Sequence, residues 1–262
     1  MKKLLFSLYI TFFSYSLFAV DLTIYMYGQT AKLTDTKLIL EDDTFRTREE
    51  YDIKWEFIEK SSYITFNYTG KNIYYGNNKE QNGQKKYLVL YGEAFINLYN
   101  QKNELVYSIF GYKYTMMLDF NVRASSELKE NNVVYKAENI VNTRNLTPWA
   151  EGNQSDGVNE KITYIPKYNL MFAGIIIIIS NGFVDYNRPH LYYYNNRVKK
   201  IRIKNIGYNE YQDIDLEDTP HYQDFNINFK EISKEIEIEI LEVYKGTRYN
   251  DTCINLMLPG GF

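Results

Sequence analysis

The sequence predicts an all-β protein, in which an antiparallel β-meander or small barrel is followed by a β-sandwich. The chain has 262 residues, of which 27 are Tyr and 15 are Phe, and aromatic residues fit the pleated, half-buried surface of a sheet. Apolar and polar residues alternate with a period of two in several short runs, which is typical of strands with one buried face. No apolar stripe with the 3.6-residue period of a helix extends over a useful length.

The overall composition is that of a folded globular protein. Hydrophobic residues make up 45% of the chain and charged residues 24%, which excludes wholesale disorder. The formal net charge of −3 gives no global positive field, so we predict no nucleic-acid partner. The single cysteine, Cys253, cannot form an internal disulfide and is expected to be a buried thiol.

The first 19 residues have the layout of a secretory signal peptide. Lys2 and Lys3 precede an apolar run over residues 4–18, and Ala19 is a small residue suited to cleavage. We therefore predict residues 1–19 as a signal peptide and a secreted, periplasmic or outer-surface location. The run is short for a membrane span, so no membrane insertion is expected after cleavage, although an uncleaved anchor stays open.

Residues 20–118 are predicted to form a β-rich N-terminal domain of unknown role. Within residues 51–57, Tyr, Ile, Trp and Phe alternate with charged residues, as in a half-buried strand. Similar runs follow, and polar turn-rich segments at 76–78 and 100–103 separate them. Consecutive strands with short links favour an antiparallel meander. The further runs cover residues 63–66, 87–91 and 105–109.

Residues 119–262 are predicted to form a second β domain with stronger strands. Residues 174–179 are a continuous apolar run, expected for a strand that is covered on both faces. Residues 200–204 and 235–240 alternate strictly, one with a basic and the other with an acidic outer face. These two strands are either neighbours with cross-strand ion pairs or two separate solvated faces. Residues 135–140 are expected to form a short helical turn.

Several motifs occur in order in this second part. They are Ala124–Leu128, Trp149-Ala150-Glu151-Gly152, Ser180-Asn181-Gly182-Phe183, Asn196-Arg197-Val198-Lys199 and Val243–Thr252. Together they resemble the NADase-type glycan-binding domain, a discoidin-like (galactose-binding-like) jelly roll that occurs fused to varied partners, including NAD-cleaving enzymes. The resemblance covers about residues 120–260 and implies a jelly-roll β-sandwich with a glycan-facing role outside the cell. It does not imply NAD hydrolysis, which belongs to a separate catalytic domain.

The resemblance also implies which residues maintain the fold and whether a metal is held. In related jelly rolls a structural calcium site uses acidic residues where this chain has Asn142-Thr143 and Asn255-Leu256. Calcium prefers several oxygen ligands, above all carboxylates, so we predict no cofactor and no metal ligands, with calcium left open. The resemblance assigns structural roles to Trp149, Gly152, Asn181, Gly182, Tyr244, Gly246, Tyr249 and Asp251.

Four candidate binding residues have a structural alternative. The Trp149 ring is either a platform for a sugar or part of the core, and we favour the core because large aromatic residues are mostly buried. Glu151 and Asp156 either accept hydrogen bonds from sugar hydroxyls or cap backbone donors of their own loop. Arg197 either binds an acidic sugar bidentately or holds down the end of a strand, and we lean towards the strand.

The loop over residues 186–196 is the best candidate for ligand recognition. It contains Arg188, His190, Tyr192 and Tyr193, a mixture of aromatic and polar side chains that binding loops often use. A run of three tyrosines must turn at least one ring away from its neighbours, so some exposure is expected. Whether that ring contacts a ligand or the other domain stays open.

The sequence contains no recognisable catalytic motif. His190 and His221 are the only histidines, and neither belongs to a nucleophile motif. A glycine-rich phosphate loop and metal-ligand spacing are also missing from the sequence. We therefore predict that the protein is not an enzyme. Two hypotheses remain: a carbohydrate-binding protein that recognises glycans, and an envelope structural or protein-interaction module with no sugar ligand.

Overall fold

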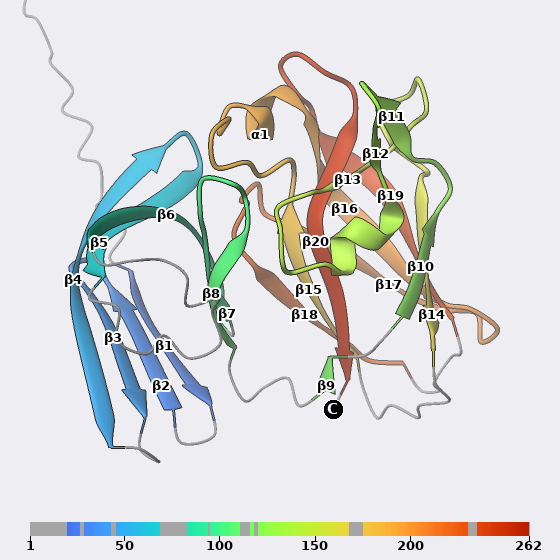
Figure 1. Ribbon diagram of the computed structural model, residues 1–262. Helices are drawn as coiled ribbons and strands as arrows, with labels where there is room; N and C mark the ends of the chain where they lie inside the picture. The colour runs from blue at the N-terminus through green and yellow to red at the C-terminus, as the bar shows by residue number, and fades with distance from the viewer. Residues whose placement is uncertain are drawn as a thin grey trace, which may run out of the picture.

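The computed structural model describes residues 20–26, 29–42, 46–68, 83–93, 95–110, 116–117, 120–167, 175–229 and 235–261. The expected signal peptide at residues 1–19 and the expected turn at 76–78 lie outside these residues. The described chain is almost entirely β-structure, arranged as an N-terminal sheet and a C-terminal sandwich (Figure 1). The all-β prediction is therefore confirmed.

The N-terminal sheet is an antiparallel meander of eight strands that pair in chain order. It curves into a half-barrel (Figure 1), and β1 and β8 approach each other without a described ladder between them. The predicted meander is confirmed. Its strands are β1 (Asp21–Met26), β2 (Gln29–Thr34), β3 (Lys37–Asp42), β4 (Thr47–Ile58), β5 (Ser61–Tyr68), β6 (Gly83–Tyr91), β7 (Phe95–Tyr99) and β8 (Leu105–Phe110).

The C-terminal unit is a sandwich with two layers. One layer has the order β10-β14-β19-β16, with β17 on the edge of β16, and the other has the order β20-β15-β18. A short parallel contact of β16 with β20 joins them. The strands are β10 (Phe120–Ala124), β14 (Lys161–Pro166), β15 (Ile175–Asn181), β16 (Asn196–Asn205), β17 (Glu210–Asp215), β18 (Gln223–Ile227), β19 (Ile236–Tyr244) and β20 (Thr252–Gly261).

Smaller elements complete this unit. β9 (Met116–Met117) and β13 (Trp149–Ala150) pair with β20, and β11 (Leu128–Glu130) pairs with β12 (Val133–Tyr135) as a separate hairpin. The expected helical turn is the 3₁₀ helix η1 (Ala137–Val141), and one further turn of helix is α1 (Leu191–Tyr194).

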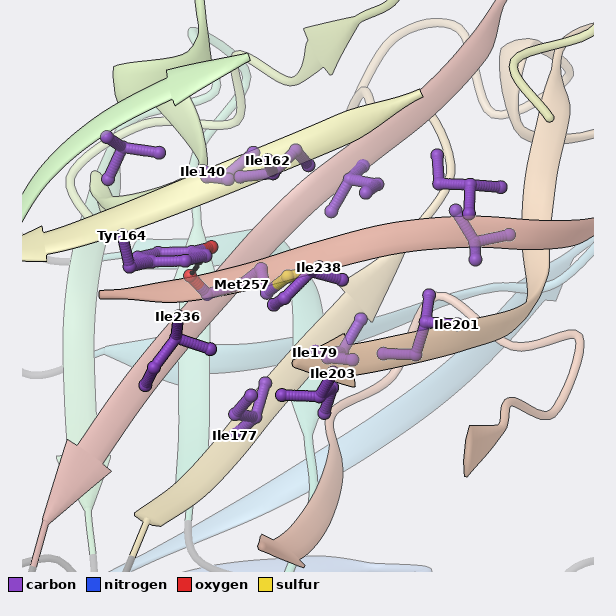
Figure 2. Close-up of a cluster of buried hydrophobic side chains, with 14 of the residues drawn as sticks. Ile140, Ile162, Tyr164, Ile177, Ile179, Ile201, Ile203, Ile236, Ile238 and Met257 are labelled. Carbon is purple, nitrogen blue, oxygen red and sulfur yellow. Dashed lines mark hydrogen bonds between the residues drawn. The ribbon is translucent and has the colours of Figure 1, made fainter. Parts of the chain in front are cut away.

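An isoleucine-rich core fills the space between the two layers of the sandwich (Figure 2). Alternate residues of each strand point into it, because side chains of a strand alternate between its faces. The core includes Ile162, Tyr164, Ile177, Ile179, Ile201, Ile203, Ile236, Ile238, Ile240 and Met257.

The basic and the acidic alternating strands are neighbours. β16 and β19 pair antiparallel, with Arg202 opposite Glu239 and Lys204 opposite Glu237. Lys204 Nζ lies 2.5 Å from Glu239 Oε2 and 3.3 Å from Glu237 Oε1. Because these side chains are near the surface, each pair contributes at most about 1 kcal/mol.

The N-terminal sheet and the sandwich share a hydrophobic core. In β15, Ile177 and Ile179 face the sandwich core, whereas Ile176 and Ile178 pack with Tyr63 and other residues of the N-terminal sheet. The continuous apolar run is thus explained, because β15 is covered on both faces. Buried polar contacts cross the same boundary: Asn97 Nδ2 donates to Tyr222 Oη at 2.7 Å.

Candidate functional site

The motif residues gather at one end of the sandwich, which we call the loop end. Figure 1 shows α1, the β19–β20 connection and the β11–β12 hairpin together there. Residues 151–160 join this end through hydrogen bonds, since Asn196 Nδ2 donates to the Asp156 carbonyl at 3.3 Å. The loop end therefore contains the candidate residues of the sequence analysis.

Two asparagines of the motifs fix the loops to the strands. Asn181 Oδ1 accepts the amides of Val198 and Gly182, both at 3.0 Å, and Asn181 Nδ2 donates to the Val198 carbonyl at 2.6 Å. Asn196 Oδ1 accepts the Gly246 amide at 2.7 Å. Both asparagines are buried, and their side-chain amides are hydrogen-bonded to backbone groups of the protein.

Gly182 is required by both space and conformation. Its φ is +74°, which favours glycine, and a Cβ there would lie 2.7 Å from the ring of Tyr192. Gly246 lies so close to the carbonyl oxygens of Tyr194 and Tyr249 that a Cβ would come nearer than 3.0 Å to each. The two glycines therefore allow α1 to pack closely against neighbouring segments.

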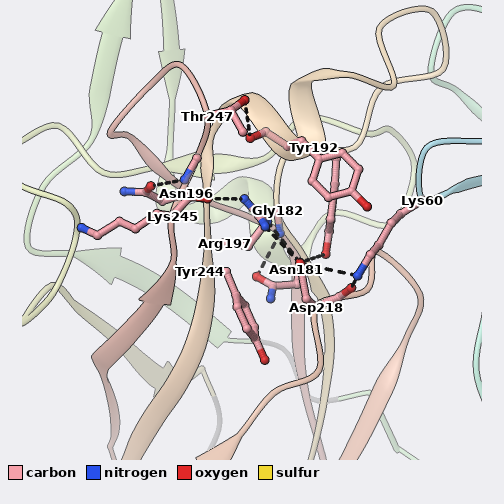
Figure 3. A network of polar contacts seen from close by, with 12 residues as sticks. Lys60, Asn181, Gly182, Tyr192, Asn196, Arg197, Asp218, Tyr244, Lys245 and Thr247 are labelled. Carbon is pink, nitrogen blue, oxygen red and sulfur yellow. Dashed lines mark hydrogen bonds and ion pairs between the residues drawn. The ribbon is translucent and has the colours of Figure 1, made fainter. Parts of the chain in front are cut away.

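Asp218 is the centre of a partly buried ion-pair network (Figure 3). Arg197 Nε and Nη2 donate to its two carboxylate oxygens at 3.1 and 3.0 Å, and Tyr192 Oη donates to Oδ1 at 2.9 Å. Burial raises the pKa of the Asp218 carboxyl, but the hydrogen bonds and charge of Arg197 hold it below its usual value. Lys60, in the β4–β5 turn, lies 3.5 Å from Asp218 Oδ2.

This network corrects the prediction for two of the candidate ligand-binding residues. Arg197 also donates to the carbonyls of Asn195 and Lys245, both at 3.0 Å. Arg197 and Tyr192 are both buried, and their polar atoms are occupied by the protein. Neither side chain is open to a ligand, and Arg197 instead holds the start of β16 in place.

Trp149 is fully buried in the sandwich core, and its Nε1 donates to the Ser126 carbonyl at 3.0 Å. The ring is therefore a packing element and not a surface platform. Tyr244 Oη donates to the Leu216 carbonyl at 2.9 Å, which ties β19 to the segment after β17.

Glu151 is a buried acid in the loop that follows β13. Its Oε2 accepts the Asn153 amide at 2.7 Å, whereas its Oε1 has no hydrogen-bond partner among the described residues. Burial, together with the charges of Glu160 and Asp251, raises the pKa of Glu151 to about 7. Because the side chain is fully buried, it is not open to a sugar, which corrects that alternative.

Asp156 is partly exposed and is engaged within its own loop. Its Oδ1 accepts the Val158 amide at 3.3 Å, and its carboxylate forms an ion pair with Lys245. The hydrogen bond from Lys245 lowers the pKa of the Asp156 carboxyl. Asp156 therefore links its loop to the β19–β20 connection.

The accessible side chains of the loop end form what we call the loop-end aromatic cluster: His190, Tyr194, Arg248 and Tyr249. The His190 and Tyr194 rings are 4.8 Å apart between centroids, and the Tyr194 and Tyr249 rings are 6.1 Å apart. The Arg248 guanidinium lies 5.5 Å from the Tyr194 ring centroid and 5.3 Å from that of Tyr249. Tyr249 is 39% exposed, and Arg248 has no carboxylate partner in the described part of the chain.

Tyr193 and Arg188 lie beside this cluster with partners of their own. The partly exposed Tyr193 ring packs 5.5 Å from that of Tyr192, with the Arg197 guanidinium also 5.5 Å away. Arg188 Nη2 pairs with Asp185 Oδ2 at 2.9 Å. The predicted recognition loop is thus split between a buried part and an accessible part.

The predicted site residues did not include Tyr194 and Arg248 at the surface or Asp218 and Lys60 in the ion-pair network. Tyr194 ends the three-tyrosine run and Arg248 lies in the last motif, so their neighbourhood was identifiable. Asp218 and Lys60 meet from separate sheets, and no local pattern marks such a pair.

A serine–histidine pair lies between the two sheets, with Ser62 Oγ 3.0 Å from His221 Nε2. Burial lowers the pKa of His221 to about 3, and His221 Nδ1 has no partner among the described residues. The His221 ring also packs against the Tyr91 ring, with 3.9 Å between the ring centroids. The contact is therefore part of the packing between the sheets.

Within the described residues, no group of three or more His, Cys, Asp or Glu side chains is placed to hold a metal ion. The helices in that part of the chain are too short and too polar to cross a membrane.

Comparisons with known proteins identify the family. No curated protein matches the chain. Among solved structures, arabinofuranosyltransferase AftD from Mycobacteria matches with a TM-score of 0.42 and 9% identity over 55% of this chain, which spans only 10% of that protein. The family 32 carbohydrate-binding module of NanJ from C. perfringens, in complex with galactose, matches with a TM-score of 0.35 and 16% identity, over 53% of this chain and 93% of the module.

A family model provides the stronger match. It covers residues 112–257, more than half of the chain and the whole loop end described above. Its description names a translocation domain of the F5/8 type C, or discoidin-like, kind and not a catalytic domain. The chain belongs to the family of NAD glycohydrolase translocation F5/8 type C domains.

Proposed function

We propose that the protein is an exported, non-catalytic binding protein that recognises glycans through the loop end of its C-terminal jelly roll. The observation that carries this proposal is the loop-end aromatic cluster. The Tyr194 and Tyr249 rings meet edge to face, and the Arg248 guanidinium lies close to both at an accessible surface. The buried motif residues beneath them hold the loops.

The cluster has the chemistry that a sugar requires. An aromatic face packs against the apolar C–H side of a pyranose ring, and Tyr presents both an apolar ring and a hydroxyl. The Arg248 guanidinium adds a charge-assisted donor suited to a carboxylated or sulfated sugar. We therefore propose acidic glycans as the ligands of the loop end.

Binding at a single loop end is expected to be weak, because a shallow surface gains little beyond the cost of ordering the ligand. Several copies of the protein on one surface would raise the avidity. Export is supported by the sequence pattern of residues 1–19. N-terminal sequencing of the secreted protein is expected to find cleavage after Ala19.

A glycan array with the full chain tests the proposal. We expect reproducible binding to acidic glycans, a loss of at least tenfold in Tyr249→Ala and in Arg248→Ala, and weaker binding at high salt. Phe57→Ala is the matched control, because Phe57 is 59% exposed on the N-terminal sheet and should leave binding unchanged. A blank array with folded protein, or full binding by Tyr249→Ala, would contradict the proposal.

The alternative is a protein-interaction role at the envelope, which the word translocation in the family description favours. In that case Tyr249 and Arg248 would contact a partner protein. Crosslinking in the native host followed by mass spectrometry would then recover one specific protein, and its recovery would be lost in Tyr249→Ala but not in Phe57→Ala.

A further inference from the structure

A second surface with binding chemistry lies on the β16–β17 hairpin, away from the loop end. The turn between the two strands borders an open hollow of about 530 Å³, within the range of ligand sites in proteins. Arg202, Lys204, Asn205, Gly207, Asn209 and Tyr211 contribute to its lining. Because α1 precedes β16 and this turn follows it, the hollow and the loop end are at opposite ends of the same strand.

The hollow lies on the face of the sandwich that the N-terminal sheet does not cover. In β16, Ile201 and Ile203 point into the sandwich core, so Arg202 and Lys204 point to the outer face. The N-terminal sheet packs on the other layer, against β15 and β20. The hollow is therefore accessible in the intact protein.

Aromatic and apolar side chains concentrate at this hairpin. Ile206, Tyr208 and Tyr211 are 41%, 48% and 61% exposed, and together they are half of the six large hydrophobic residues that are exposed in the described chain. Three such residues within one hairpin form a patch that solvation alone does not account for.

The Tyr211 ring is held in place from one side. The Arg202 guanidinium lies 4.3 Å from the ring centroid, and Arg202 is itself fixed by a bidentate pair with Asp213, with distances of 2.7 and 2.8 Å. A ring that is fixed before binding loses less conformational entropy when a ligand stacks on it. Tyr211 therefore has the properties of a preorganised platform.

The two cations that line the hollow are compensated within the protein, and the Glu210 carboxylate accepts a hydrogen bond from Asn205 Nδ2 at 3.1 Å. Arg202 pairs with Asp213, and Lys204 pairs with Glu237 and Glu239. A charged ligand would have to compete with these pairs, whereas an uncharged ligand would not. Asn209, which borders the hollow, offers amide donors and acceptors for hydroxyl groups.

We propose that this hollow is a second ligand site, which binds a neutral saccharide by stacking a pyranose ring on Tyr211. The inference rests on the proposed glycan-binding function only for the class of ligand. The residues of the hollow, and the charge of the ligand it would bind, differ from those proposed for the loop end. Two sites at opposite ends of one sandwich would let a single molecule bridge two glycan chains.

Saturation-transfer NMR with the full chain tests this site, using soluble neutral oligosaccharides of galactose, glucose and N-acetylglucosamine at millimolar concentration. We expect saturation transfer from the protein to at least one of these oligosaccharides. The affinity should fall at least tenfold in Tyr211→Ala and should be retained in Tyr211→Phe. Binding should be insensitive to salt and unchanged in Tyr249→Ala.

The outcomes separate the two proposals. Loss of neutral-sugar binding in Tyr211→Ala, with acidic-glycan binding intact, would support the second site. No transfer from folded protein to any neutral sugar, or equal binding by Tyr211→Ala, would overturn it whatever the loop end binds. Thermal melting of each variant shows whether the fold is retained.

Discussion

At the scale of single residues, two carboxylates with limited exposure, one partly and one fully buried, determine how the loop end is held. The Asp218 carboxylate accepts hydrogen bonds from Arg197 and Tyr192 and forms an ion pair with Lys60. Glu151, in contrast, is buried with one carboxylate oxygen that has no partner in the described chain. The first arrangement stabilises the charged form of the acid and the second destabilises it. The two acids therefore respond in opposite directions to pH.

Asp218→Asn is expected to destabilise the protein by about 3 kcal/mol, because it leaves the Arg197 charge buried without its partner. The matched control is Asp213→Asn, which removes the same bidentate geometry from Arg202 at a more exposed position and should cost less than about 1 kcal/mol. Urea unfolding of both variants measures the difference. Equal losses would contradict the structural role of the Asp218 network.

Glu151→Gln is expected to stabilise the protein at high pH. The folded pKa of about 7 lies above the usual 4.5, so the wild-type protein is stabilised below the unfolded pKa and loses this contribution as pH rises towards 7. The loss amounts to at most roughly 3 kcal/mol. Melting temperatures of variant and wild type should agree near pH 4 and differ most at pH 8. A difference that does not depend on pH would show that Glu151 does not titrate as described.

At the scale of elements, α1 and the β19–β20 connection form one unit through close backbone approach. The amides of Thr247 and Tyr249 donate to the carbonyls of Tyr193 and Tyr194 at 2.9 and 2.8 Å, and Gly246 allows this approach. The loop-end aromatic cluster spans both segments, so its geometry depends on this contact.

Gly246→Ala is therefore expected to weaken the proposed glycan binding and to lower the unfolding free energy by about 1–3 kcal/mol, since the added methyl group collides with backbone atoms. Gly83→Ala serves as the control, because a Cβ at that position meets open space and lies outside both proposed sites, although its φ of +138° adds strain of about 1 kcal/mol. Array binding and melting temperature are both measured. Full glycan binding by Gly246→Ala would show that the geometry of the loop-end aromatic cluster does not depend on this backbone contact.

At the scale of the whole molecule, the N-terminal sheet and the sandwich are held together by a common core. Strands β5 to β7 contribute buried residues on both faces, since Leu88 and Leu90 face the sandwich while Val89 faces the half-barrel. Because the two units bury each other's apolar surface, neither is expected to be stable without the other.

We expect the full chain to unfold in one cooperative transition, with coincident curves from circular dichroism and tyrosine fluorescence. Ile178→Ala, at the boundary between the sheets, and Ile177→Ala, in the sandwich core, should each cost about 2–5 kcal/mol and shift that one transition. Two separate transitions, or a proteolytic fragment that retains only the sandwich, would contradict a shared core.

Much of the fold could be predicted from the sequence because its causes are local. The period-two runs in β4, β16 and β19 identify strands whatever their partners, since alternation follows from the geometry of a single strand. The charges of β16 and β19 left a cross-strand pairing open as one of two alternatives, and the structure shows that the two strands pair. The order of the motifs was likewise enough to predict the discoidin-like sandwich.

Only the tertiary structure decided which motif residues are buried and which remain accessible. Arg197, Tyr192 and Glu151 are polar or aromatic residues in loops, and their type alone is compatible with ligand binding. Their burial depends on Asp218 and on backbone groups far away in the chain, whose approach no local pattern encodes. The apolar run of β15 determined that both of its faces are covered, but the identity of the cover, the N-terminal sheet, is set by long-range packing between two units.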